Sequence, residues 1–169
     1  VFKQVVAGGG LIKVINVKGK ADLSRKDLDE LTKFVGVYGS KGMAWIKNTD
    51  EGWQSPIVKF FTEDEQKVLT QKTNFEKGDL LLFGAGSEKI VNDALGHLRK
   101  RLGEQLGLIN KDALAFVWIT DFPLFGYDDE SKRHTAIHHP FTAPKAEDIS
   151  LLDSEPLKVR SDAYDLVLN

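Results

Sequence analysis

Residues 116–125 read FVWITDFPLF, and residues 138–144 read HHPFTAP. The first segment is an apolar run with β-branched and aromatic residues, which predicts a short strand that stops at Pro123. Because proline cannot donate to a sheet ladder, each segment predicts a strand that ends in a stiff loop. Such a loop can hold polar groups, here the imidazoles of His138 and His139, at the end of a rigid sheet.

Helix and strand signals alternate over the residues that precede these two segments. Ser24 is followed by an acid at Asp27, which predicts an N-cap and a helix with one apolar face. A second capping box begins at Thr62, and an apolar stripe predicts the longest helix over residues 87–106. We expect strands over residues 7–19, 43–47, 57–61 and 79–83, the second and third of them as a hairpin. This order predicts an α+β fold, a two-layer sandwich of an antiparallel sheet with helices on one face.

A polar turn after the longest helix predicts a domain boundary near residues 107–112. It separates a domain over residues 1–110 from a second one over residues 111–169. In the second domain we expect a polar loop and a short helix between three strands, with the strands at 115–120, 134–139 and 163–168, the loop at 127–133 and the helix at 146–152.

The bulk composition excludes several classes of protein. The 169 residues carry a net charge of −2 with near-equal acids and bases, which argues against a strongly basic surface for nucleic acid. There is no cysteine, so a disulfide framework, a thiolate nucleophile and a Cys-based zinc site are excluded. No apolar run approaches the roughly 20 residues that span a bilayer. No signal peptide is visible, so we expect a soluble cytoplasmic protein.

Several sequence words, in this order and spacing, resemble the bacterial-type aspartyl-tRNA synthetases, a family of class II synthetases. Besides the opening pair, the words are GGLIKVINVKG (9–19), SRK (24–26), GMAWIK (42–47), GDLLLF (78–83), VNDALG (91–96) and AYDLVLN (163–169). The resemblance covers essentially the whole chain. It departs from the family at Gly126, because an acid usually follows the Asp-Phe-Pro-x-Phe word there, and no role of that acid carries over.

The resemblance implies an architecture and a reaction. Residues 1–110 would be the GAD insertion domain, of GAD/DCoH-like type, and residues 111–169 would be strands of the antiparallel class II core between motifs 2 and 3. The implied enzyme is a homodimeric ligase of protein biosynthesis that activates L-aspartate with ATP and Mg²⁺ and transfers it to tRNA(Asp). The words of motifs 1, 2 and 3 and the anticodon-binding barrel do not occur here. We therefore expect a fragment with no catalytic residue and no bound cofactor, inactive alone.

The resemblance also singles out three candidate site residues. The first histidine of the HHPF word is expected to contact the amino acid, which makes His138 the candidate contact to L-aspartate. His139 and Asp121 are candidate supporting residues. From the residues alone, one imidazole of such a pair is a structural donor and the other lies at the surface, because neighbours in a strand point to opposite faces. From the residues alone, an Asx-type turn cap is slightly favoured for Asp121 over a direct role in substrate binding.

Metal chemistry at the histidines is a weaker hypothesis. His134 completes an H-x-x-x-H-H pattern with His138 and His139. In a strand, however, His134 and His138 would lie about 13 Å apart. That separation is too long for one zinc ion, whose bonds to nitrogen measure about 2.0–2.1 Å. We expect no metal site, and a small metal-dependent hydrolase is the least favoured function.

An alternative function is a non-catalytic module that contacts tRNA or protein. It would be related to the GAD domain in the B subunit of the tRNA-dependent amidotransferase. The short basic cluster Arg99-Lys100-Arg101 permits a weak contact to a tRNA backbone, although such a run is usually a solvated helix face. The DFP and HHPFT words favour the synthetase, since they belong to that family and not to the amidotransferase subunit.

Overall fold

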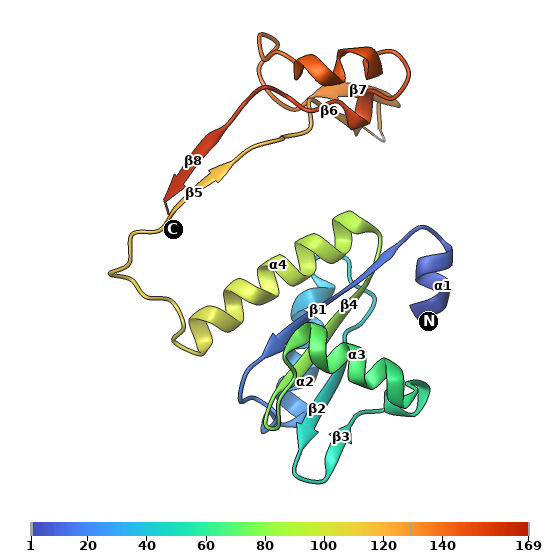
Figure 1. Ribbon diagram of the computed structural model, residues 1–169, viewed down its shortest axis with the longest axis vertical. Coiled ribbons are helices and arrows are strands. Elements are labelled where there is room, and N and C mark those ends of the chain that lie inside the picture. Colours follow the sequence, from blue (N-terminus) through green and yellow to red (C-terminus); the bar gives the residue numbers. More distant parts are fainter. Residues whose placement is uncertain (1, 129, 169) are drawn as a thin grey trace. The chain divides into compact units, whose positions relative to one another are not determined.

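The computed structural model describes residues 2–128 and 130–168, so the outermost residues of both predicted domains, 1 and 169, lie outside the described residues. The chain divides into two compact units, Val1–Ile109 and Asn110–Asn169 (Figure 1).

The N-terminal unit is built on a four-stranded sheet with the order β1-β4-β2-β3. The strands are β1 (Leu11–Val17), β2 (Ala44–Thr49), β3 (Gly52–Gln54) and β4 (Leu80–Gly86). Every neighbouring pair is antiparallel. The predicted α+β class with an antiparallel sheet is therefore confirmed.

The central strand β4 supplies the core on both faces of this sheet. Leu80 and Leu82 belong to one apolar cluster, whereas Leu81 and Phe83 belong to another, and all four are at most 5% exposed. Because successive side chains in a strand point to opposite faces, a continuous apolar run means burial on both sides.

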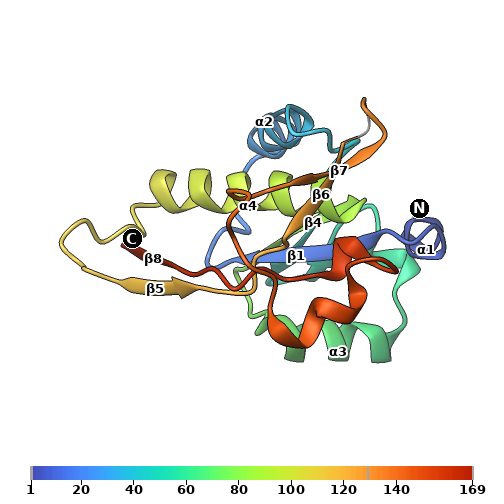
Figure 2. The same cartoon turned by 90° about the horizontal axis from the view of Figure 1, so that it is seen from above.

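Helices cover both faces of the sheet. On one face, α2 (Arg25–Gly36) and α4 (Glu88–Gln105) bury Leu28, Val35 and Leu98 against the first cluster (Figure 2). On the other face, α3 (Glu63–Thr73) contributes Leu69 and the short α1 (Phe2–Ala7) contributes Phe2 to the second cluster. The predicted restriction of the helices to one face does not hold, because the second side of β4 needs its own apolar cover.

Two local expectations in this unit are corrected. The expected strand over residues 7–19 is shortened to β1, because α1 ends at Ala7 and a turn with Gly9 at φ 78° precedes the strand. The hairpin after β2 closes with β3 and not with residues 57–61, of which Val58–Phe60 form the 3₁₀ helix η1. Gly52 permits the tighter turn, because its backbone has φ 102°. Residues with a side chain rarely adopt such a positive φ.

The C-terminal unit contains two short antiparallel ribbons. One pairs β5 (Phe116–Ile119) with β8 (Asp165–Leu168), and the other pairs β6 (Phe125–Asp128) with β7 (Arg133–Ala136). The 3₁₀ helices η2 (Ala146–Leu151) and η3 (Pro156–Lys158) follow β7. Its buried centre includes Leu124, Val159 and Ser161.

Three expectations for this unit are also corrected. The strand expected over residues 134–139 ends at Ala136, so that neither histidine of the HHPF word lies in it. The polar loop expected over residues 127–133 is partly β6 and β7, and the helix expected over residues 146–152 is the 3₁₀ helix η2.

Candidate functional site

Three segments of the C-terminal unit come together around the predicted site residues. The segment 159–162 is the middle one. On one side Leu124 N donates to Val159 O at 2.8 Å, and on the other side Lys145 N donates to Arg160 O at 2.9 Å. Single antiparallel bridges, Pro123 with Arg160 and Pro144 with Ser161, show the same arrangement. Proline and its neighbours thus fix the segments 121–124 and 143–145 without regular strands.

His138 is half-buried in the loop that follows β7. The preceding residue, Ile137, donates its N–H to Leu124 O at 3.1 Å, which ties this loop to the first of the three segments. The imidazole crosses the ring of Phe122 at 73°, with 5.1 Å between the ring centroids. Its Nε2 is buried and has no hydrogen-bond partner among the described residues. His138 is therefore held by ring packing against Phe122, and its Nε2 is left without a polar contact within residues 2–128 and 130–168.

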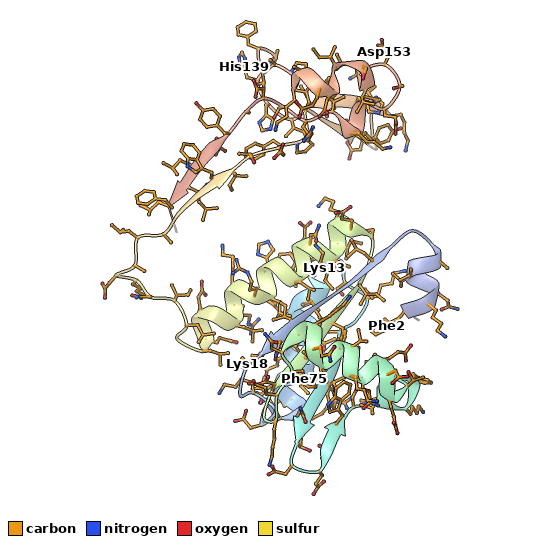
Figure 3. All side chains as sticks on the ribbon, viewed as in Figure 1. Phe2, Lys13, Lys18, Phe75, His139 and Asp153 are labelled. Atoms are coloured by element: carbon orange, nitrogen blue, oxygen red, sulfur yellow. The ribbon has the colours of Figure 1, made fainter. Side chains whose placement is uncertain are left out.

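His139 is exposed and has a local role. Its Nδ1 accepts a hydrogen bond from Phe141 N at 3.2 Å, and its carbonyl accepts one from Thr142 N at 2.9 Å. The rings of Phe141 and His139 cross at 67°, with their centroids 4.8 Å apart. Figure 3 labels His139 in the C-terminal unit. These contacts cap the turn that contains Pro140.

Asp121 is the acceptor of a small ionic network. It has a left-handed backbone with φ 61°, and its carboxylate accepts from Lys145 Nζ, from Arg160 Nη1 at 3.2 Å and from Thr120 Oγ1 at 2.9 Å. The Lys145 ammonium, above all, holds the pKa of this carboxyl below its ordinary value, with help from Thr120 and Arg160. Asp121 is thus an ion-pair partner of two cations.

Arg160 connects this network to a buried acid that sequence reasoning missed. Its Nε and Nη2 bind the two carboxylate oxygens of Asp148 at 2.8 and 2.9 Å, and its backbone N–H reaches the same carboxylate at 3.0 Å. Glu147 accepts a further bond from Nη2 at 2.9 Å. The Arg160 side chain and backbone N–H lower the pKa of Asp148 to about 2. No sequence pattern marked Arg160, because its partners lie in separate segments of the chain.

The structure separates the other residues that the sequence suggested. His134 lies on β7 and packs against Tyr127 at 5.6 Å. Within residues 2–128 and 130–168, no three His, Asp or Glu side chains are grouped so that they could hold a metal ion. Arg101 lies over the ring of Phe34 at 4.5 Å, so the basic cluster on α4 contributes one of its charges to packing against α2.

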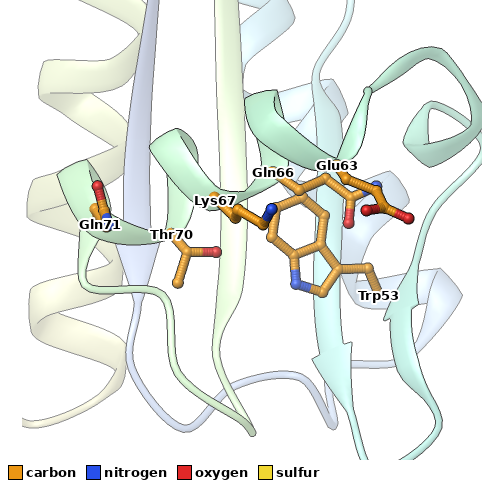
Figure 4. A pocket seen from close by; sticks show the side chains of 6 residues that line it. All are labelled: Trp53, Glu63, Gln66, Lys67, Thr70 and Gln71. Carbon is orange, nitrogen blue, oxygen red and sulfur yellow. The ribbon is translucent and has the colours of Figure 1, made fainter.

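A hollow in the N-terminal unit contains none of these residues. It has a volume of about 440 Å³ and opens between Trp53 of β3 and the side chains of α3 (Figure 4). Its lining consists of Trp53, Glu63, Gln66, Lys67, Thr70 and Gln71.

Among the described residues, no helix is both long and apolar enough to cross a membrane.

Comparison with known proteins adds a family and a set of relatives. The GAD domain family matches residues 2–95. Over its whole length the chain is 53% identical to an aspartate–tRNA(Asp/Asn) ligase of Desulfosudis oleivorans and covers 28% of that protein. It is 56% identical to the ligase of the same name from Brachyspira hyodysenteriae, of which it covers 29%. It is 52% identical to an aspartate–tRNA ligase of Shouchella clausii, again covering 29%. The chain thus spans less than a third of the curated relatives that it matches.

Proposed function

Because the chain belongs to the GAD domain family and resembles aspartate–tRNA ligases along its whole length, we propose that it functions as part of such a ligase. Residues 1–110 would be its GAD insertion domain, and residues 111–169 would be part of its class II catalytic core. The ligase would activate L-aspartate with ATP and transfer it to tRNA(Asp).

The observation that carries this proposal is the extent of the match. The relatives align with all 169 residues, whereas the GAD domain family covers only residues 2–95. A tRNA- or protein-binding module that shared just the GAD domain would give no reason for the likeness to extend beyond it. The ligase is therefore favoured over the interaction module.

Within the ligase, His138 would contact the L-aspartate substrate. A neutral imidazole can accept from an ammonium group, and a protonated one can donate to a carboxylate. The half-buried ring and its anchored loop would limit its freedom before the substrate binds, which lowers the entropic cost of binding. Asp121 and His139 would act indirectly, the first through Lys145 and Arg160 and the second through its turn.

The remaining partners belong to the whole ligase. We assign ATP, Mg²⁺ and tRNA(Asp) to it, together with homodimer formation and a cytoplasmic location. Among the described residues, no three carboxylate or imidazole side chains are grouped so that they could hold a metal ion. No step of the reaction is assigned to a metal ion on this chain.

A substitution in a full-length aspartate–tRNA ligase that carries this segment tests the role of His138. His138→Ala should raise the KM for L-aspartate in ATP–pyrophosphate exchange by about 10- to 100-fold, the range for loss of one hydrogen bond to a charged group. His134→Ala, on the exposed strand β7, should change it less than about twofold. An unchanged KM for His138→Ala would contradict the assignment.

The 169-residue chain by itself should not form aspartyl-adenylate. Adenylate formation depends on groups that neutralise the phosphates of ATP, and we assign these to the rest of the ligase. Pyrophosphate exchange above background, measured with aspartate, ATP and the purified chain, would refute this expectation.

A further inference from the structure

Asp121 has a backbone conformation that a residue with a side chain rarely adopts. Its φ is 61°, in the left-handed region. In the part of the chain that the structure describes, two other non-glycine residues have a positive φ: Asn74, which ends α3, and Lys132, in the turn between β6 and β7. A helix C-cap and a hairpin turn are ordinary places for such a backbone. Asp121 is in neither, because it comes just after the strand β5.

The antiparallel pairing goes out of step at the same point. The last pair of the β5–β8 ribbon is Ile119 with Asp165, and the next pair along the chain is Pro123 with Arg160. Three residues separate these two pairs on the first segment, whereas four separate them on the second. An extra residue on one side, as in a β-bulge, bends the paired segments and turns the side chains beyond it in a new direction. Asp121 therefore lies in the bend where the chain leaves the ribbon.

Two cations from separate segments meet at the carboxylate of Asp121. Lys145 Nζ and Arg160 Nη1 both bind Oδ1, the second at 3.2 Å, and Thr120 Oγ1 donates to Oδ2 at 2.9 Å. Arg160 is itself fixed, because its guanidinium and its backbone N–H bind the buried Asp148. A carboxylate tethered on a short side chain to two fixed cations restricts the backbone of its own residue.

The residues directly after Asp121 carry the contacts that place His138. The carbonyl of Phe122 accepts from the buried Ser161, from its N–H at 2.7 Å and from its Oγ at 3.2 Å. The rings of Phe122 and His138 cross at 73°, with their centroids 5.1 Å apart. Further along, Leu124 O accepts from the N–H of the residue before His138 at 3.1 Å. A change of φ at residue 121 would disturb these contacts, because rotation about one backbone bond moves the chain beyond it.

We infer that Asp121 is a positioning residue: its ion pairs with Lys145 and Arg160 hold its left-handed backbone, and this backbone places Phe122 against His138. Asp121 touches no substrate in this role. What position 121 needs is a positive φ, and the carboxylate serves to stabilise it. Only the effect on aspartate binding rests on the proposed function, whereas the effect on the two rings does not.

Glycine separates the backbone from the carboxylate. It adopts a positive φ without steric cost, whereas alanine does not, and neither has a carboxylate. In the 169-residue chain, Asp121→Ala should weaken the nuclear Overhauser effect between the rings of Phe122 and His138 at least about twofold, and Asp121→Gly should retain it. The rings of Tyr127 and His134, 5.6 Å apart on the β6–β7 ribbon, give a reference in the same sample. Equal losses in the two variants would overturn the inference.

Lys132 provides a matched control with the same kind of backbone. It has φ 54° and is exposed in the turn between β6 and β7. Lys132→Ala and Lys132→Gly make the same two changes at a left-handed residue that does not precede Phe122. Neither should alter the contact between the rings of Phe122 and His138. A loss as large as that of Asp121→Ala would show that position 121 has no special role.

A second variant asks whether the cation acts through the backbone. Lys145→Met keeps an apolar stem and removes the ammonium, so it should weaken the contact between the rings of Phe122 and His138 in the unmutated chain. In the Asp121→Gly background the same substitution should have little further effect, because a glycine needs no ion pair to keep a positive φ. Additive losses in the two backgrounds would contradict the inference.

The KM for aspartate separates this inference from the proposed function. In a full-length ligase that carries this segment, Asp121→Ala should raise the KM about 3- to 30-fold, the population change that a left-handed non-glycine backbone can cause, and Asp121→Gly should raise it clearly less. If the ring contact follows this order but neither Asp121→Ala nor His138→Ala changes the KM, the backbone role stands and the aspartate contact of His138 is refuted. If His138→Ala raises the KM while glycine and alanine at position 121 act alike, the role of Asp121 is refuted alone.

Discussion

Asp79 shows how a single buried acid organises a turn. The carboxylate is 3% exposed and accepts hydrogen bonds from the N–H groups of Gly19 and Glu76 and from Asn16 Nδ2, and it pairs with Lys18 at 2.9 Å. Burial by itself would raise its pKa. The backbone N–H groups, Lys18 and Asn16 outweigh burial and lower the pKa to about 2.

This pKa predicts an acid-sensitive fold. Because the folded value lies below the ordinary 3.8, Asp79 contributes stability above pH 3.8 and loses it as the pH falls through about 2. Asp79→Asn should lower the free energy of unfolding at neutral pH by about 2 kcal/mol and flatten its decline at acid pH. Urea unfolding at several pH values measures both. The exposed Asp64→Asn should change neither, and an equal effect of the two variants would contradict the prediction.

Two glycines differ in what a side chain would meet. A Cβ at Gly10 would lie 2.6 Å from the carbonyl oxygen of Gly86 and 2.8 Å from Val5 Cγ1, whereas one at Gly126 would lie 3.5 Å from Ile137 Cγ1. Gly10→Ala should therefore destabilise the chain by about 1–3 kcal/mol through overpacking, and Gly126→Ala should stay within about 0.5 kcal/mol. Thermal unfolding of both variants is the measurement, and the reverse order of stability would refute it.

At the scale of elements, helix starts could be predicted because their signals are local. Ser24 with Asp27 and Thr62 with Glu65 form the two predicted capping boxes, and both are confirmed. The strands were harder to predict. Residues 57–61 have the apolar pattern of a strand. In the structure, however, the turn at Gly52 pairs β2 with the shorter β3 instead. Pairing depends on distant partners and turn geometry, which periodicity does not contain.

The caps allow a matched test of one hydrogen bond. The side chain of Ser24 accepts from Asp27 N at 3.2 Å at the start of α2, whereas Ser87 at the start of α4 makes no such bond. Ser24→Ala should cost about 1 kcal/mol of unfolding free energy, and Ser87→Ala should cost clearly less. Chemical denaturation of the two variants measures the difference. Equal costs would show that the capping hydrogen bond is not the cause.

At the scale of the whole molecule, the candidate site was predicted only in part. The resemblance marked His138, His139 and Asp121, and the structure brings the segments that carry them together in one unit. The roles assigned to these residues stay predictions. Arg160 and Asp148 could not be found, because their pairing depends on how the 159–162 segment inserts between two others, a tertiary property without a sequence period.

The ribbon of β5 and β8 predicts self-association of the 169-residue chain. All eight residues of this ribbon are exposed, and they include Phe116 at 63% and Trp118 at 61%. Contiguous apolar surface and open strand edges favour pairing with another copy. Sedimentation velocity at rising concentration should show oligomers, and Trp118→Lys should shift them toward monomer. Phe60→Lys, at a residue 73% exposed in the N-terminal unit, should have little effect, and a strictly monomeric chain would refute the prediction.

The pairing of β1 with β4 also imposes an order of events during synthesis. Leu11 lies opposite Gly86 and Val17 opposite Leu80, so the first strand meets its partner only after the intervening helices and hairpin have been made. A ribosome that adds roughly 5–20 residues per second needs on the order of 3–15 s for that interval. Throughout it, the nascent β1 has no strand partner, and a chaperone that binds exposed apolar segments can reach this strand before β4 does.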